Sequence, residues 1–159
     1  MKARIFYDSK LARLLLLGCH TIMLFGAVFT KKKERKSVYD AGINFFSDVV
    51  KNHELIHVAQ YRECFVSGCV LAVLFVFLRG FSLWYVLLPV LLYYVLYLVE
   101  WAVSFVHHLF SKRKKDFVGA NDKAYDASAM EMEAYDNERD LDYLSRRKWY
   151  AFMKYYGKL

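Results

Sequence analysis

The chain has 159 residues, of which 57% are hydrophobic and 25% charged, and its formal net charge is +7. The length suits one domain, and the separation of the charges from long apolar runs excludes an ordinary soluble domain and predicts an all-α polytopic membrane helical bundle. The two basic clusters, residues 31–36 and 112–115, each follow an apolar run, so we expect them to bind anionic lipid and not nucleic acid.

The first apolar run covers residues 11–29 and is long enough to cross a bilayer as a helix. Asp8 or Ser9 can cap its start, whereas Arg13 and His20 within it favour a tilted helix. No small-residue cleavage site precedes the basic cluster, so we expect an uncleaved anchor. The three cysteines lie in or beside apolar runs and are expected to be reduced thiols.

A second helix is expected over residues 43–64. At helical spacing, one of its faces carries apolar side chains and both histidines of the segment, and these are Phe46, Val49, Val50, His53, His57, Gln60 and Cys64. The apolar stretch 65–110, with a turn at Arg79-Gly80, predicts a membrane hairpin. Aromatic residues of the hairpin, among them Tyr93 and Tyr97, are expected to lie at the bilayer interfaces.

The C-terminal part predicts one amphipathic helix over 123–148, with acidic residues early and basic residues at its end, as the helix dipole favours. Because both basic clusters should be cytoplasmic, the two crossings between them return the chain to the same side. The helices over 43–64 and 123–148 can therefore meet on the cytoplasmic face, and the expected location is a bacterial inner membrane.

The segment His53-Glu54-Leu55-Ile56-His57 has the HExxH pattern. On a helix, residues four apart lie on one face, so both imidazoles can bind one metal ion, and zinc suits imidazole ligands. Glu54 lies off that face and can take a proton from a metal-bound water, which makes it the candidate general base. Gln60 can orient a ligand, whereas Asn52 is expected to be solvated.

A catalytic zinc site needs a third protein ligand and an open position. Acidic residues and histidines elsewhere in the chain are the candidates, namely Glu100, His107, His108, Glu131, Glu133 and Glu138. The segment 131–135 suits the role best because it lies beside an apolar stripe on the expected cytoplasmic helix. Glu131 and Glu133 project about 200° apart on a helix, so only one of them can be the ligand, and Glu138 can support Glu131 from the same face.

An HExxH helix, a membrane hairpin and a cytoplasmic helix with the pattern E-x-x-A together resemble the membrane gluzincins, the family of the CAAX prenyl proteases and heat-shock membrane proteases. The run from His53 to Gln60, with Glu-x-Glu-Ala-Tyr after it, is also similar to small bacterial HExxH membrane proteins. The resemblance implies zinc peptidase activity, with Glu131, three residues before Ala134, as the third zinc ligand. The chain departs from the family at Tyr135, where the family has Asp.

The predicted function is hydrolysis of a peptide bond by a zinc metallopeptidase, with Glu54 as base and Tyr135 or Tyr125 as oxyanion donor. Its partners would be membrane lipid and a peptide or protein substrate. The alternative is a non-catalytic protein with a structural metal, a small membrane component of a larger assembly with other membrane proteins. A closed site with His107 or Glu138 as fourth ligand would favour the alternative, and an open position would favour the enzyme.

Overall fold

The structure is a computed structural model that describes residues 3–16, 20–37, 40, 42–111, 121, 124 and 126–157. Its strands and α-helices are β1 (Arg4–Phe6), α1 (Lys10–Leu15), β2 (Thr21–Leu24), β3 (Ala27–Thr30), α2 (Asp48–Arg79), α3 (Leu87–Ser111), α5 (Ala129–Asn137) and α6 (Tyr143–Arg146), with the 3₁₀ helices η1 (Leu83–Val86) and η2 (Ala151–Tyr155). The molecule is mostly helical, but its N-terminal part forms a three-stranded sheet. The prediction of an all-α fold is therefore wrong in this part.

The N-terminal sheet occupies a segment for which the sequence predicts an apolar helix over 11–29. The sheet has the order β1-β3-β2, with β2 antiparallel and β1 parallel to β3. β2 and β3 contain Thr, Ile, Val and Phe, which favour strands. The two residues of the turn between them, Phe25 and Gly26, have φ of 50° and 76°, as a type I′ hairpin requires. Residues 11–15 are helical as predicted, in α1, where the Ser9 hydroxyl caps the start by accepting from Ala12 N at 3.4 Å. The rest of the helix prediction is wrong because the Phe25-Gly26 turn divides the remaining apolar run into two short strands.

One continuous helix, α2, carries the HExxH segment and the first leg of the hairpin. It begins after Ser47, whose hydroxyl accepts a hydrogen bond from Val50 N at 3.3 Å, and it ends after 32 residues at Gly80, whose φ is 80°. The predicted start at residue 43 is too early. Residues 42–44 form a turn, and Phe45 then makes an isolated bridge with Lys33, whose carbonyl oxygen accepts a hydrogen bond from Phe46 N at 2.9 Å.

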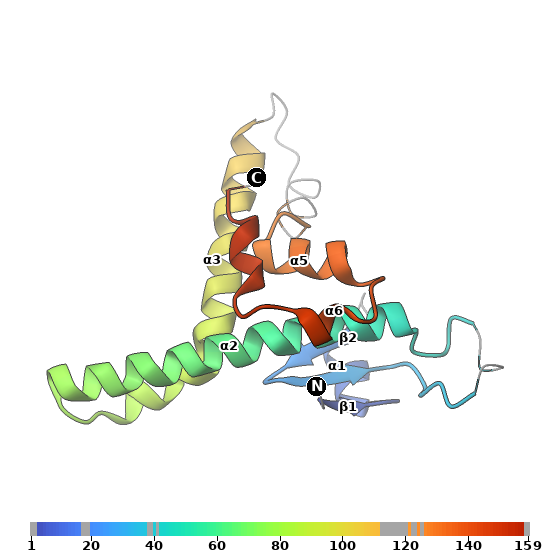
Figure 1. The fold of residues 1–159 in the computed structure, drawn as a ribbon, viewed down its shortest axis with the longest axis horizontal. Coiled ribbons are helices and arrows are strands. Elements are labelled where there is room, and N and C mark those ends of the chain that lie inside the picture. Colours follow the sequence, from blue (N-terminus) through green and yellow to red (C-terminus); the bar gives the residue numbers. More distant parts are fainter. Residues whose placement is uncertain are drawn as a thin grey trace.

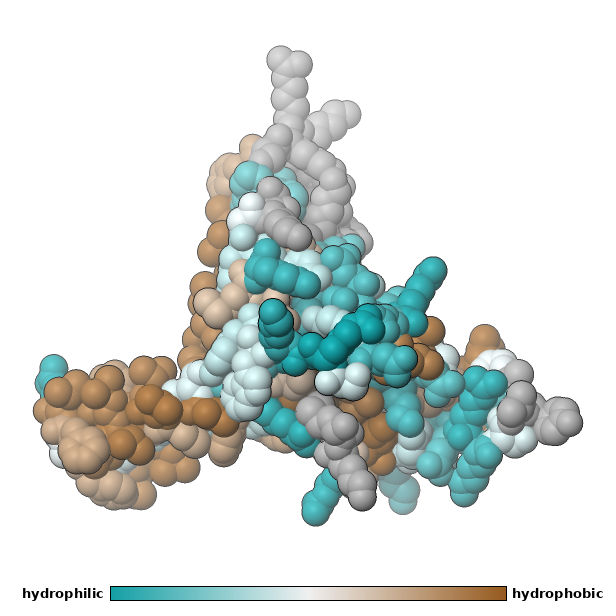
Figure 2. Space-filling model, viewed as in Figure 1, coloured by the Kyte–Doolittle hydropathy of each residue, from teal (hydrophilic) through white to brown (hydrophobic). Residues whose placement is uncertain are grey.

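Two segments, α2 and Leu83–Phe110, are long and apolar enough to cross a membrane. Hydrophobic residues gather at the hairpin end and along α3, while hydrophilic residues cover the C-terminal elements (Figure 2). The two helices cross closely at Gly68, where a Cβ atom would lie 2.7 Å from the carbonyl oxygen of Leu88. Pro89 lies in the first turn of α3, where its missing N–H breaks no hydrogen bond within the helix.

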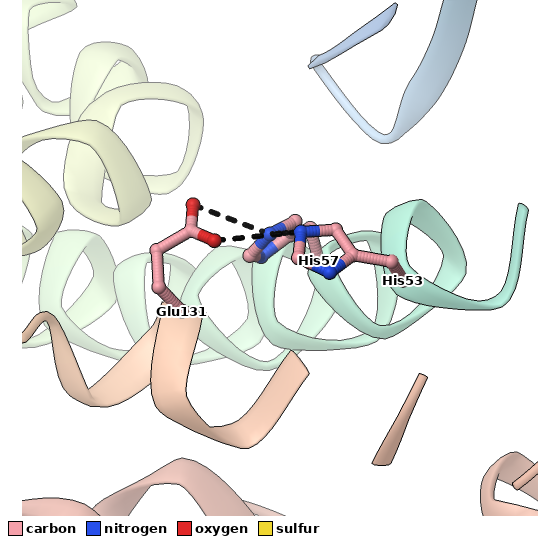
Figure 3. A group of neighbouring side chains, drawn as sticks. All are labelled: His53, His57 and Glu131. Atoms are coloured by element: carbon pink, nitrogen blue, oxygen red, sulfur yellow. Dashed lines mark hydrogen bonds and ion pairs between the residues drawn. The ribbon is translucent and has the colours of Figure 1, made fainter. Parts of the chain in front are cut away.

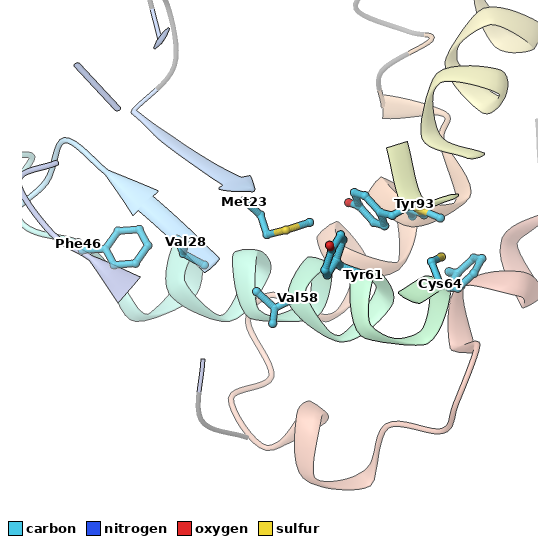
Figure 4. Close-up of a cluster of buried hydrophobic side chains, with 9 residues drawn as sticks. Met23, Val28, Phe46, Val58, Tyr61, Cys64 and Tyr93 are labelled. Atoms are coloured by element: carbon cyan, nitrogen blue, oxygen red, sulfur yellow. The ribbon is translucent and has the colours of Figure 1, made fainter. Parts of the chain in front are cut away.

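Helix α2 lies between the sheet on one side and α5 on the other (Figure 1). On the sheet side a buried apolar cluster joins the strands to α2 and α3, and its members include Met23, Val28, Val58, Tyr61, Cys64 and Tyr93 (Figure 4). The turn between β2 and β3 also contacts α3, because Phe25 N donates a hydrogen bond to Tyr94 Oη at 2.7 Å. The sheet and α3 thus hold the first half of α2, up to Cys64, in place.

Among the residues that the structure describes, α5 and α6 are separate short helices where the sequence predicts one helix over 123–148. The side chain of Asn52 accounts for the break. Its Nδ2 donates to the carbonyl oxygens of Asn137, Glu138 and Asp140 at 3.0–3.1 Å. A continuing helix would use such carbonyls for its own hydrogen bonds. Because Asn52 is 4% exposed, the prediction that it is solvated is wrong.

Candidate metal centre

His53 and His57 lie one turn apart on the face of α2 that packs under α5. Their Nε2 atoms are 3.1 Å apart, and Glu131 faces both rings from α5 (Figure 3). The side chains of His53 and His57 are 12% and 7% exposed, so the point where they meet is nearly shielded from water. Two imidazole nitrogens at this separation require a proton or a metal cation between them, because two lone pairs repel.

Glu131 completes a group of three possible metal donors. Its Oε2 lies 3.4 Å from His53 Nε2, and its Oε1 lies 3.4 Å from His57 Nε2. One donor atom from each residue lies within 4.8 Å of the other two, so the group could hold a metal ion. Ligands that are 2.0–2.2 Å from a tetrahedral zinc ion are about 3.4 Å from one another. The observed spacing therefore fits one ion.

The carboxyl of Glu131 gives a second indication of a cation. Its Oε2 is buried and accepts no hydrogen bond from any described residue, which is costly for a polar atom unless a cation lies beside it. Burial raises the pKa of Glu131, but the facing imidazoles of His57 and His53 outweigh this effect and hold the pKa below its ordinary value. The group is then ionised, as a metal ligand must be.

The Nδ1 atoms of the two histidines, which face away from the point where the three possible metal donors meet, also have partners. His53 Nδ1 lies 3.1 Å from Glu138 Oε2, and His57 Nδ1 lies 2.8 Å from Gln60 Oε1. An oxygen acceptor at Nδ1 keeps the proton on that nitrogen and leaves the Nε2 lone pair for a metal. Glu138 and Gln60, which the sequence predicts as supporting or ligand residues, thus contact the histidines from behind.

Two tyrosines of α3 also reach the donor group. Tyr97 Oη donates to Glu131 Oε1 at 2.9 Å, and Tyr93 Oη lies 3.4 Å from His57 Nδ1. Tyr93 is 5% exposed and therefore packs inside the protein, while its predicted position at a bilayer interface stays a prediction. The sequence offers only a weak signal for this contact: the two tyrosines are four residues apart on one helix face.

Two other predicted ligand candidates have different partners. The carboxylate of Glu100 accepts hydrogen bonds from Ser128 Oγ at 2.7 Å and from Ala129 N at 2.9 Å, and it thereby caps the N-terminus of α5. Glu133 faces away from the donor point and accepts a hydrogen bond from Arg147 Nε at 2.6 Å. Glu100 therefore positions the helix that carries Glu131.

The remaining candidates lie apart from the donor group. His107 and His108 are near the end of α3, and neither belongs to the group of donors found among the described residues. Tyr125, a predicted oxyanion donor, and the basic cluster 112–115 lie outside the residues that the structure describes. Their predicted roles stay predictions.

A cavity of about 590 Å³ opens beside the donor group. Its lining combines residues of the helices with the start of β2, and includes His53, Glu54, Tyr135, Glu138, His20 and Thr21. The rings of Tyr135 and His53 are 4.8 Å apart, measured between centroids. Burial and the charge of Glu131 raise the pKa of Tyr135 to about 12, so its hydroxyl stays protonated at neutral pH and can donate a hydrogen bond.

Comparison of the chain with protein-family models, with curated proteins and with solved structures found no significant match. The resemblance to membrane gluzincins therefore rests on the HExxH segment, the apolar hairpin after it and the spacing from Glu131 to Ala134. Function has to be argued from the chemistry of the site.

Proposed function

We propose that this chain is a membrane zinc metallopeptidase of the gluzincin type. The observation that carries the proposal is that donors from two separate helices meet at one buried point, His53 and His57 from α2 and Glu131 from α5. The HExxH pattern fixes only the first two. An acidic side chain that reaches the same point from a segment more than 70 residues later is independent support.

The side chains around the cavity suit hydrolysis of a peptide bond. Bound zinc would supply a Lewis acid for the substrate carbonyl and would lower the pKa of a water molecule. Glu54 lines the cavity beside His53 and can take a proton from the attacking water and pass it to the leaving amine nitrogen. The Tyr135 hydroxyl can donate a hydrogen bond to the oxygen on which negative charge develops.

The sheet provides a further argument that the substrate is a peptide in an extended conformation. β2 pairs with β3 on one side, and no described strand pairs with its other side. Thr21, the first residue of β2, lines the same cavity as Glu54. A peptide that binds along this edge would make backbone hydrogen bonds as a further strand and would pass Glu54.

The number of donors favours an enzyme over a structural metal site. Among the described residues, the donor group has three members, and Glu138 contacts the ring nitrogen of His53 that faces away from the point. Three protein ligands leave a fourth position for water or substrate, as in catalytic zinc sites. A structural site would use a fourth protein ligand.

The proposed site lies on the part of α2 that precedes its exposed apolar segment. The same helix continues from the histidines into a segment apolar enough to cross a membrane. The basic cluster 31–36 and the cluster 112–115 favour the cytoplasmic side of a bacterial inner membrane. Membrane lipid and a membrane-proximal peptide or protein would then be the partners, and nucleic acid would not.

Metal content is the first test. Protein purified in detergent should contain about one zinc per chain by elemental analysis, because three donors converge on one point. His57→Ala and Glu131→Gln should each lose most of the zinc, whereas Glu54→Gln should retain it. Full zinc in both ligand variants would show that the site is wrong.

Activity is the second test, with an unfolded protein such as casein as probe. The wild-type protein in detergent should cleave it, and Glu54→Gln should lose cleavage by about 100-fold or more, since proton transfer contributes about 10²- to 10⁴-fold. A zinc-loaded wild-type protein that cleaves neither casein nor membrane-anchored peptides would favour the structural-metal alternative.

A further inference from the structure

A buried cluster of charges lies directly behind the donor group. Arg147 lies between Glu63 of α2 and Glu133 of α5, and the three side chains are only 5%, 6% and 0% exposed. Its Nη2 donates to Glu63 Oε2 at 3.0 Å and to Glu133 Oε2 at 3.2 Å, and its Nε donates to Glu133 Oε1 at 2.6 Å. Tyr143 Oη also donates to Glu133 Oε1, at 2.7 Å. Arg147 and Tyr143 therefore both donate hydrogen bonds to the carboxylate of Glu133.

Gln60 connects this cluster to the donor group. Its Nε2 donates to Glu133 Oε2 at 3.1 Å and to the carbonyl oxygen of Met130 at 3.0 Å. Both of these partners are acceptors, so the amide group cannot turn over without placing its own oxygen against two oxygens. The side chain is 0% exposed, and water does not offer it another partner. The orientation of the amide is therefore fixed by Glu133 and Met130.

The fixed amide determines which nitrogen of His57 carries the proton. Gln60 Oε1 lies 2.8 Å from His57 Nδ1 and can only accept a hydrogen bond. The proton of the neutral ring is then on Nδ1, and the lone pair of Nε2 points toward Glu131 and His53. That tautomer is the one a metal ligand needs.

We propose that Glu133, paired with Arg147, is a positioning residue for the metal ligand His57 and acts through the amide of Gln60. The inference rests on the proposed metal site. It makes the C-terminal segment that carries Arg147 a part of the metal centre, although no atom of that segment is a ligand. It also gives Glu133 a role distinct from that of Glu131, two residues away on the same helix.

A purely structural role for the cluster makes a different prediction. A buried ion pair generally contributes no more stability than well-packed apolar side chains would, and a structural cluster would affect unfolding alone. A positioning role also changes the affinity and the geometry of the metal. Glu63 offers a matched control, because it shares Arg147 with Glu133 but has no hydrogen bond to Gln60 among the described contacts.

The test measures zinc affinity by competition with a chelator, on full-length protein in detergent that remains folded. Glu133→Met removes the acceptor for Gln60 and should weaken zinc binding by roughly 10- to 100-fold, the effect typical of residues behind a metal ligand. Glu133→Gln keeps an oxygen that can accept from Gln60 and should restore most of the affinity. Glu63→Gln should leave zinc affinity unchanged.

A double-mutant cycle identifies the route. If Glu133 acts through Gln60, Glu133→Met should cost nothing further in a Gln60→Ala background. The visible absorption of bound Co²⁺ should shift in Glu133→Met and Gln60→Ala and stay unchanged in Glu63→Gln. Both readouts separate positioning from stability, because a structural residue would lower the unfolding temperature without moving them.

Equal losses in Glu133→Met and Glu63→Gln, or additive losses with Gln60→Ala, would overturn the positioning role and leave the metal site intact. Retention of zinc by His57→Ala would overturn the metal site itself and the positioning role with it. If Glu133→Met does not fold, Gln60→Ala and Glu133→Gln carry the comparison. Weakened zinc binding in Gln60→Ala, with Glu133→Gln and Glu63→Gln close to wild type, would then support the role. Unchanged zinc affinity in Gln60→Ala, or a loss in Glu133→Gln as large as in Gln60→Ala, would overturn it.

Discussion

The two halves of α2 place side chains in opposite surroundings. In the first half, up to Cys64, four polar residues are covered: Asn52, His57, Gln60 and Glu63 are at most 6% exposed. In the second half apolar groups are uncovered, and Phe77 and Leu78 are 83% and 67% exposed. The same backbone helix thus serves two environments. The two halves differ in which parts of the chain pack against them.

The comparison shows what each half requires. Buried polar groups are stable only when other parts of the chain supply partners, and here α5 and the C-terminal segment supply them. A large exposed apolar surface indicates a membrane or a protein partner, and the length of the helix favours a bilayer. At a rise of 1.5 Å per residue, α2 is about 48 Å long, so it links the donor group rigidly to the apolar hairpin.

The largest effect is expected in the polar half. Arg147→Met leaves the carboxylates of Glu63 and Glu133 buried without their cation, and removal of one partner of such a group costs about 3–5 kcal/mol. Thermal unfolding in detergent would measure it, and the exposed neighbour Arg146→Met should change stability by less than about 0.5 kcal/mol. An equally small change for both variants would contradict the burial of the cluster.

A charge distinguishes the two halves directly. Val73→Arg places a cation in the middle of the apolar half and should make membrane insertion less favourable by about 2.5–3.5 kcal/mol, if lipid covers this position. Val49→Arg, in the polar half, should have little effect, although both valines are exposed, Val73 at 56% and Val49 at 36%. Glycosylation-site mapping of the inserted fraction would measure both. Equal insertion of the two variants would argue against a transmembrane α2.

A smaller effect is expected from a single amide of the polar half. Asn52→Ala leaves the carbonyl oxygens of Asn137, Glu138 and Asp140 without this donor, and the loss of a buried partner costs about 1–3 kcal/mol. The end of α5 should loosen, which amide hydrogen exchange would detect as faster exchange over residues 137–143. Lys51→Ala, at the preceding position, is the control and should leave that exchange unchanged.

Local patterns account for what the sequence predicts well. The spacing of His53 and His57 requires only a helix, and α2 indeed places both on one face. The apolar stretch after them is long enough to determine a helical hairpin. The apolar run over 11–29 is compatible with either a helix or strands, because its β-branched residues and the Phe25-Gly26 turn favour strands. The longer apolar stretch over 65–110 is compatible only with helices.

Contacts between distant segments account for what the sequence does not reveal. Nothing near Arg147 distinguishes it from the exposed basic residues beside it, and its burial depends on Glu63, which is 84 residues away. The contacts of Tyr93 and Tyr97 with the donor group depend on how α3 crosses α2. Residue patterns leave both Glu131 and Glu133 open as the third ligand, and only the family resemblance favours Glu131.

The close crossing at Gly68 has a consequence for genetics. Any side chain at this position would meet the backbone of α3 at Leu88 and Pro89, so the two helices would have to separate. The helix displaced in this way carries Tyr93 and Tyr97, which touch His57 and Glu131. Missense changes at Gly68 should therefore appear in a loss-of-function screen beside those of the candidate metal ligands, although glycine itself is not a ligand.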